Sequence, residues 1–187
     1  MIIIVPYNPK WPAEFATIRA TIYEALGDLA LRIDHIGSTA VPGLAAKDRI
    51  DIQITVRELA PEIEEALQRY GYQRSIRLTH DHHPPTFVGP DSEWDKWFFN
   101  PPELQRPTNV HVRIQGRANQ RYPLLCRDYL RTHPLAAQAY GQVKQALAKY
   151  HANDVDAYYD VKDPVFDIIM AGAEDWAQET QWQPNEE

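Results

Sequence analysis

A short turn of small residues and a carboxylate on a nearby strand are the residues best placed to do chemistry. In Gly37-Ser38-Thr39, glycine permits a tight turn, and the hydroxyl and backbone N–H groups can hold an anion. Lys47 follows, and Asp51 comes 14 residues after Gly37. If the two flanking strands are neighbours, a phosphate held at the turn would lie near a divalent metal ion held by Asp51, as nucleotidyl transfer requires. The alternative is a turn that caps a short helix beside a solvated aspartate.

Three further residues are expected to line the same cleft. Gln53 shares the polar face of the predicted strand 50–56 with Asp51, because side chains alternate along a strand. His111 and Arg113 likewise share one face of the predicted strand 109–114. We therefore predict one cleft that joins the small-residue turn to the polar faces of two strands.

A second polar group, His80-Asp81-His82-His83, contains the ligand types that Zn²⁺ and other transition metals prefer. His80 and His82 would face the same way on a strand. The alternative, which we favour because Pro84 and Pro85 follow directly, is a solvated polar loop.

Aromatic residues are dense between positions 94 and 99, namely Trp94, Trp97, Phe98 and Phe99. They could form a wall against which a base stacks. At this density they more often pack as core, and we favour that interpretation.

The elements that must position these residues change character along the chain. Apolar spacing predicts a helix between Trp11 and Gly27 and another between Pro61 and Gly71. Strands are predicted at 2–5, 29–36, 50–56, 85–89, 94–99 and 109–114. The last 70 residues read as helices: one apolar stripe runs from Leu124 to Leu130, another runs from Ala136 to Tyr150 after Pro134, and a final segment runs from about Asp154 to Gln181 with a break near Asp163 caused by Pro164. Ile168 is placed on the apolar face of the final segment, and we expect all these stripes to pack against the sheet part and to close one side of the cleft. This order predicts a single α+β domain over 1–187, with a motif-bearing sheet part to about 115 and a helical part over about 118–181.

Composition excludes several classes of protein. The 187 residues are 44% hydrophobic and carry a net charge of −7, which is ordinary for a globular chain. A single cysteine, Cys126, permits no intrachain disulfide. The acidic balance argues against nucleic-acid and membrane-surface partners. The apolar opening stops at Pro6, and no run approaches the roughly 20 residues that cross a bilayer, so we expect a cytoplasmic protein.

The run from His35 to Lys47, followed by Ile50-Asp51-Ile52, resembles the GrpB family. The resemblance covers nearly the whole chain. Its other parts are Val5-Pro6-Tyr7-Asn8-Pro9-Lys10-Trp11, Gly71-Tyr72, His111-Val112, Arg127-Asp128-Tyr129-Leu130-Arg131, His133-Pro134, and the pair Tyr140 and Lys144.

The GrpB family looks like a divergent branch of the nucleotidyltransferase superfamily. The resemblance implies a mixed β-sheet flanked by helices, with Gly37, Ser38, Thr39 and Lys47 at the phosphates and Asp51 as the catalytic and Mg²⁺-binding carboxylate. Active nucleotidyltransferases usually carry a second acid where this chain has Gln53, and a third on a later strand. Strand 109–114 offers no acid, so one Mg²⁺ ion, or none, is expected.

Three functions follow. The first is transfer of a nucleotidyl or related group to a small molecule. The second is a catalytically inactive domain that binds a nucleotide or another phosphate-containing small molecule. The third is a folding or assembly partner linked to coenzyme A biosynthesis, because GrpB-like domains occur fused to dephospho-CoA kinase in some bacteria.

Overall fold

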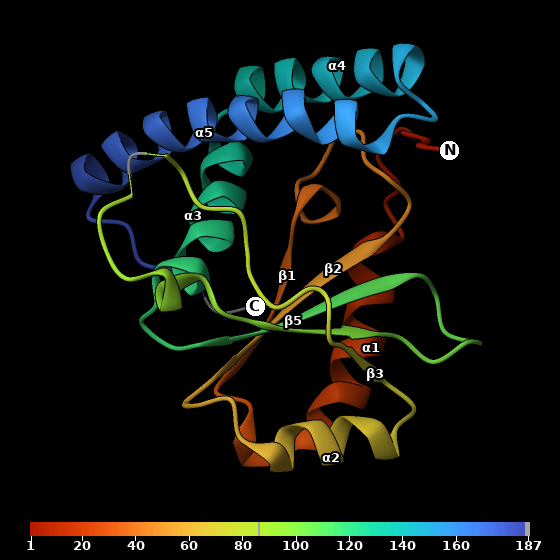
Figure 1. The fold of residues 1–187 in the computed structure, drawn as a ribbon. Helices are drawn as coiled ribbons and strands as arrows, with labels where there is room; N and C mark the ends of the chain where they lie inside the picture. Colours follow the sequence, from red (N-terminus) through yellow and green to blue (C-terminus); the bar gives the residue numbers. More distant parts are fainter. Residues whose placement is uncertain (86, 186–187) are drawn as a thin grey trace.

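The computed structural model describes residues 1–85 and 87–185 and shows a five-stranded mixed sheet flanked by helices (Figure 1). The strands lie in the order β1-β2-β5-β4-β3, with β2 and β5 parallel and all other neighbours antiparallel. Their bounds are β1 Arg32–Ile36, β2 Ile50–Val56, β3 Gln73–Ser75, β4 Trp97–Asn100 and β5 Thr108–Ile114. The predicted α+β class with a mixed sheet is confirmed.

The two faces of the sheet differ sharply in chemistry. Ile50, Ile52, Ile54 and Val56 of β2 are fully buried on one face, as strict alternation predicts. They pack in one hydrophobic cluster with α1 (Trp11–Leu26) and α2 (Pro61–Arg69). The opposite face carries the polar residues, and the parallel register of β2 and β5 sets Asp51 beside Asn109 and Gln53 beside His111.

The C-terminal helices are α3 (Ala118–Thr132), α4 (Pro134–Tyr150) and α5 (Val155–Thr180), and α4 and α5 lie together above α3 in Figure 1. We expected their apolar stripes to pack against the sheet and to close one side of the cleft. The packing expectation is wrong, whereas residues of α4 and α5 do line the cleft. The stripes form a separate cluster with Val41 and Leu44 from the loop after β1. The reason is that the sheet face toward α3 is polar, so the loop supplies the apolar surface instead.

The long helix α5 also differs from expectation, because it runs through Pro164 without a break. A proline inside a helix removes one backbone hydrogen bond. Packing of α5 against α3 and α4 compensates for that loss. Ile168, predicted on the apolar face of α5, is instead 73% exposed.

Other differences are local. At 2–5 only Val5 forms a bridge, to Ala46, and β1 starts at Arg32 because Gly27–Leu29 form a 3₁₀ turn. A strand was predicted over 85–89. Position 86 lies outside the described residues, and positions 85 and 87–89 form no strand. Residues 91–94 form a 3₁₀ turn before β4. Within the described ranges, no helix is long and apolar enough to cross a membrane.

Candidate functional site

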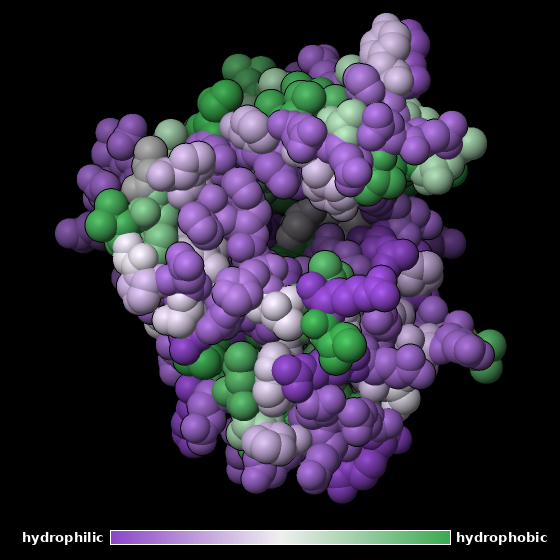
Figure 2. Space-filling model, in the orientation of Figure 1, coloured by the Kyte–Doolittle hydropathy of each residue, from purple (hydrophilic) through white to green (hydrophobic). Residues whose placement is uncertain are grey.

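A cleft of about 520 Å³ lies between the polar face of the sheet and the helices α4 and α5. Figure 2 shows this face hollowed beneath the upper helices, with mostly hydrophilic residues at the rim. The charged residues that line it comprise five bases and three acids: Lys47, Arg49, Lys96, Lys144, Lys162, Asp51, Asp81 and Asp163. The chain as a whole carries a net charge of −7, so the excess of basic over acidic side chains in the cleft is opposite in sign to the charge of the whole protein.

The small-residue turn lies at the inner end of the cleft. Gly37 has φ 70° and ψ −169°, a conformation essentially restricted to glycine. A Cβ atom on Gly37 would lie 2.6 Å from Oδ2 of Asp51, so the carboxylate packs directly on the turn. The sequence prediction that Asp51 and the Gly-Ser turn lie together is therefore confirmed as geometry.

We expect Gly37→Ala to destabilise the fold by more than the same change at Gly43. Both glycines have positive φ, but a Cβ at Gly43 would meet nothing within 4 Å. Strained backbone alone costs about 1–3 kcal/mol, and displacement of Asp51 adds to that at Gly37. Urea unfolding of both variants measures the difference. Equal losses would show that the contact between Gly37 and Asp51 contributes nothing.

Lys144 of α4 reaches the turn from the opposite wall. Its Nζ donates to Oγ of Ser38 at 2.7 Å and to the carbonyl of Ala45 at 2.6 Å, and the side chain is almost fully buried. Burial, reinforced by nearby Lys162, lowers the pKa of Lys144 from its ordinary 10.5 to about 7. The ammonium is therefore only partly charged at neutral pH, and a bound anion would restore its charge.

Asp51 and Thr39 are both held in place by neighbours. Asn109 donates to Oδ1 of Asp51 at 2.7 Å, and burial raises the pKa of this carboxyl despite that bond and the nearby basic residues. Thr39 lines the cleft, but its hydroxyl lies 2.9 Å from Nε2 of His35. Asp51 is thus a carboxylate with one oxygen committed to Asn109 and the other against the turn.

The outer wall of the cleft is aromatic and basic. Lys47 lies over the rings of Tyr158 and Tyr159 of α5, at 4.5 and 4.8 Å from their centroids, and donates to the Tyr159 hydroxyl at 3.2 Å. Lys162 follows one turn later on the same helix and pairs with Asp163. The predicted phosphate ligand Lys47 therefore lines the same cleft as Ser38 and Asp51.

Asp81 is the centre of a buried polar network rather than part of a metal cluster. Arg113 forms a bidentate pair with its carboxylate, with both N···O distances at 2.8 Å, and Lys96 donates to Oδ1 at 2.6 Å. Although burial opposes ionisation, these two cations hold the pKa of Asp81 well below its ordinary 3.8. Burial and the same two cations lower the pKa of His111 well below 6.5. The imidazole is therefore neutral, with Nδ1 facing Lys96 and Arg113.

The three histidines expected as alternative metal ligands diverge. His80 pairs with Asp95 at 2.8 Å, His82 pairs with Asp167 at 3.3 Å, and His83 lies against Trp94. The solvated-loop alternative describes His80 and His83 better, whereas His82 lines the cleft. Across the described parts of the chain, no three His, Cys, Asp or Glu side chains are grouped so as to hold a metal ion.

Gln53 does not line the cleft, contrary to expectation. It is fully buried beneath the cleft floor, donates to the carbonyl of Gln120 at 2.8 Å and accepts from Arg113 at 2.7 Å. Because α3 packs over this part of β2, the side chain is enclosed between strand and helix. His111 lines the cleft, as predicted, whereas Arg113 lines only the smaller neighbouring cavity.

A family model described as GrpB protein matches residues 1–171. The chain belongs to the GrpB family. Crystal-structure comparison agrees: conserved protein GrpB from Enterococcus faecalis superposes with a TM-score of 0.72 at 26% identity, covering 91% of this chain and 96% of that one.

Relatives of this GrpB chain fall into two kinds. A dephospho-CoA kinase of Mycolicibacterium paratuberculosis is 40% identical over 97% of this chain but only 48% of its own length. The chain therefore spans about half the length of that kinase. A UPF0157 protein of Halalkalibacterium halodurans is 33% identical, covering 92% of this chain and 82% of its own length.

Several residues of the GrpB cleft were not predicted as site residues. Lys144 is 106 positions from Ser38, and Lys96 and Lys162 come from two further segments, whereas Asp81 was considered only within the histidine-rich group. The Tyr140 and Lys144 pair within the family resemblance was the one sequence signal that could have identified Lys144. Nothing in the sequence marks Lys96 or Lys162 apart from other surface-type lysines.

Proposed function

We propose that this GrpB chain binds a small phosphate-containing molecule in the cleft between Ser38, Asp51 and α5. The observation that carries the proposal is Lys144, a buried lysine held against the hydroxyl of the Gly-Ser turn. A buried amine whose pKa is near 7 is costly to charge, and a bound anion supplies the missing counter-charge. Ser38, Lys144 and Lys47 all line this cleft, and Nζ of Lys144 lies 2.7 Å from Oγ of Ser38.

The charge balance of the cleft supports the same ligand class. Two of its three acids are already neutralised, Asp81 by Lys96 and Arg113, and Asp163 by Lys162. The remaining acid, Asp51, shares the cleft with three basic side chains, those of Lys47, Arg49 and Lys144. A phosphate group would balance this excess, because charge-assisted hydrogen bonds to phosphate are among the strongest that proteins make.

Calorimetric titration of pyrophosphate into wild type and two lysine variants tests the proposal. Lys144→Met removes the buried amine at similar volume, whereas Lys149→Met removes an exposed amine of the same helix. A lost charge-assisted hydrogen bond weakens binding roughly 10- to 100-fold, so Lys144→Met should fall by that factor and Lys149→Met should match wild type. Equal affinity in all three proteins would refute the assignment of Lys144.

Binding of an anion should also take up a proton near neutral pH. Sulfate is a suitable probe because it does not titrate there. A bound dianion raises the pKa of Lys144 above about 7, so sulfate affinity should fall by up to tenfold per pH unit above pH 7. The stability of the ligand-free protein should respond to pH in the opposite direction. The folded protein releases the Lys144 proton near pH 7, whereas the unfolded chain keeps it up to about pH 10.5, so this group makes the free energy of unfolding rise between pH 7 and pH 10.5. A pH-independent affinity that persists in Lys144→Met would contradict the coupling.

Nucleotidyl transfer with Mg²⁺ is the second candidate function, supported by the position of Asp51 beside the Gly-Ser turn. The residues present do not form a two-metal centre, because Gln53 is buried away and β5 offers Asn109 and His111 instead of an acid. A single Mg²⁺ ion that arrives with the phosphates would find Asp51 as its one carboxylate ligand, since Mg²⁺ is usually held by one or two carboxylates plus phosphate oxygens.

Asp51→Asn is expected to change the affinity for the anion in opposite directions under the two candidate functions. In a site that holds the anion without metal, removal of a negative charge should tighten sulfate binding several-fold in the presence of EDTA. In a site where Mg²⁺ bridges Asp51 and the ligand, the same variant should weaken binding of Mg²⁺-pyrophosphate. The measurement is a pair of titrations, with Asp91→Asn as a control on an exposed aspartate outside the cleft. Weakened binding in EDTA would show that Asp51 supports the anion in another way.

The relation to dephospho-CoA kinases supports a third candidate, a partner role linked to coenzyme A biosynthesis. Five of the curated relatives carry that name, and each matches this chain over 48% of its own length. The test is whether this chain changes the folding yield or activity of a separate dephospho-CoA kinase, in wild-type form and as Lys144→Met. An effect that survives in Lys144→Met would favour a partner role independent of the cleft.

A further inference from the structure

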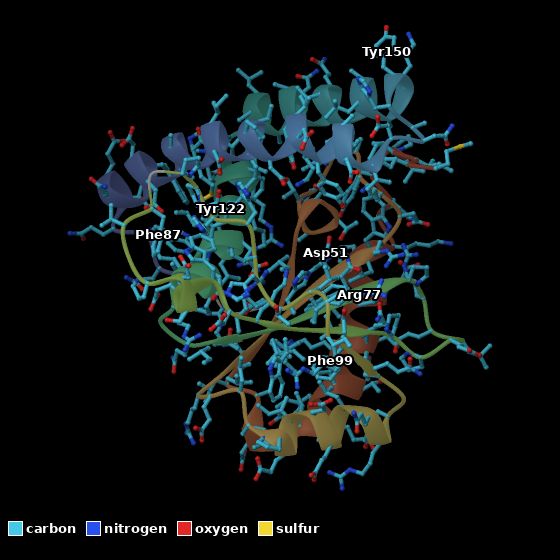
Figure 3. The ribbon with its side chains drawn as sticks, in the orientation of Figure 1. Asp51, Arg77, Phe87, Phe99, Tyr122 and Tyr150 are labelled. Carbon is cyan, nitrogen blue, oxygen red and sulfur yellow. The ribbon has the colours of Figure 1, made fainter. Side chains whose placement is uncertain are left out.

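The cleft adjoins a second, smaller cavity of about 240 Å³, which we call the side compartment. It is lined by residues of α3, α5 and β5 and by Asp81, His82 and Trp94, and in Figure 3 Tyr122 lies on α3 to one side of Asp51. The cleft and the side compartment share the lining residues Asp81, His82, His111, Lys162 and Asp163. The two cavities therefore adjoin one another at these residues.

Half of the residues that line the side compartment but not the cleft are aromatic, namely Trp94, Tyr122 and Phe166. Trp94 and Tyr122 meet edge to face at 5.5 Å between centroids, and Tyr122 lies 5.3 Å from Phe166. The hydroxyl of Tyr122 donates to Asp167 at 3.0 Å, which fixes the ring in place. Such walls suit a flat ring, because stacking on aromatic side chains accepts any planar π-system.

Two buried polar atoms of the same lining lack hydrogen-bond partners among the described residues. They are Nε1 of Trp94, a donor, and Oδ1 of Asn119, an acceptor. Both residues are at most 2% exposed. The amide of Asn119 is correctly oriented, because its Nδ2 donates to Asp81 and to the carbonyl of Asp95. Buried polar groups are normally paired, so this donor and this acceptor indicate a missing partner.

We infer that the side compartment receives an aromatic nitrogen heterocycle of the nucleobase type, attached to the phosphate that lies in the cleft. A nucleobase offers a planar face to Tyr122 and Phe166, an acceptor for Trp94 and a donor for Asn119. The compartment is smaller than the roughly 300–1,000 Å³ of sites for whole drug-sized ligands, so it suits one ring system of a larger molecule. This inference rests on the proposed phosphate site and names the class of molecule that uses it.

Affinity for ribose 5-phosphate and for the four ribonucleoside 5′-monophosphates tests the inference. At least one nucleotide should bind at least tenfold more tightly than ribose 5-phosphate, because only nucleotides fill the side compartment. If ribose 5-phosphate binds as tightly as every nucleotide, the compartment holds solvent only and the inference is overturned. If none of these molecules nor pyrophosphate binds, the proposed function fails first, and the inference fails with it.

Two variants test whether Trp94 and Phe166 cause the preference for a nucleotide over ribose 5-phosphate. Trp94→Phe removes the unpaired N–H, and Phe166→Leu removes one aromatic wall. Each should reduce the preference for the nucleotide about tenfold while leaving the affinity for ribose 5-phosphate unchanged. Trp97→Phe is the matched control, since Trp97 lies on β4 against Arg74 and lines neither cavity. A nucleotide preference that both Trp94→Phe and Phe166→Leu retain would place the ring elsewhere and overturn the inference. Thermal unfolding identifies a variant that has lost its fold, in which case the other decides.

Discussion

A fragment that ends at Thr132 is expected not to fold. Removal of α4 and α5 uncovers Leu125 and Leu130 of α3 together with Val41 and Leu44 of the loop after β1. Each large side chain contributes about 1.5–3 kcal/mol by burial, whereas the whole domain has a net stability of only about 5–15 kcal/mol. The fragment also loses Lys144, which holds Ser38 and the carbonyl of Ala45.

Circular dichroism and thermal unfolding of fragment 1–132 beside the full chain measure this effect. The expected result is a chain without a cooperative transition, since the fragment loses the α4 and α5 part of the cluster that covers α3 and the loop after β1. A soluble fragment with a sharp transition would show that the sheet part, with its own cluster around Trp11 and Ile52, is an independent folding unit.

Asp81→Asn is expected to destabilise the fold by about 3–5 kcal/mol, because the variant leaves Arg113 and Lys96 buried without their counter-ion. The side chains of Arg113 and Lys96 are 5% and 10% exposed, so water cannot replace the carboxylate. The pKa of Asp81 is lowered in the folded protein. Its contribution to stability is therefore present above the ordinary pKa of 3.8 and is lost as the pH falls below that value.

Chemical denaturation of Asp81→Asn and of the exposed control Asp91→Asn tests this prediction. The first variant should lose a large part of the free energy of unfolding at pH 7, and the second should match wild type. The difference between Asp81→Asn and wild type should shrink at acidic pH. A difference that does not change between pH 7 and pH 3 would contradict the role of the Asp81 carboxylate as a counter-ion.

Local patterns predicted the strands that carry the site. Strict alternation over 50–56 identifies β2, and the alternation over 109–114 identifies β5, so Asp51 and His111 were placed on the correct strands and faces. The Gly-Ser turn followed from residue type, and its closeness to Asp51 follows because β1 and β2 pair antiparallel as neighbours. These inferences need only periodicity and one strand pairing.

Longer-range features could not be predicted from such patterns. Gln53 was expected in the cleft because it alternates with Asp51, but the packing of α3 over β2 buries it, and no local signal reports that contact. Pro164 is accommodated because α5 is held by its neighbours rather than by propensity alone. Lys144 reaches Ser38 only because α4 lies across the end of the sheet, and that placement depends on the whole fold.

The histidine-rich segment shows the same limit. His80, Asp81 and His82 suggested a metal site by composition, yet the chain directs them to three different partners. Asp81 is the centre of a buried ion-pair network, and its partners Arg113 and Lys96 are 32 and 15 positions away. Residue type identified the segment as polar and capable of pairing, but the pairing itself is set by tertiary contacts.

Anomalous diffraction from crystals soaked in selenate tests the central claim most directly. Selenate is a dianion of the same shape as sulfate, and selenium locates it without reference to the protein atoms. We predict an anomalous peak in the cleft within hydrogen-bonding distance of Ser38 Oγ and Lys144 Nζ, and its absence in crystals of Lys144→Met. A cleft without a peak in wild-type crystals, while selenate occupies surface lysines such as Lys149, would contradict the assignment of this cleft as a phosphate-binding site.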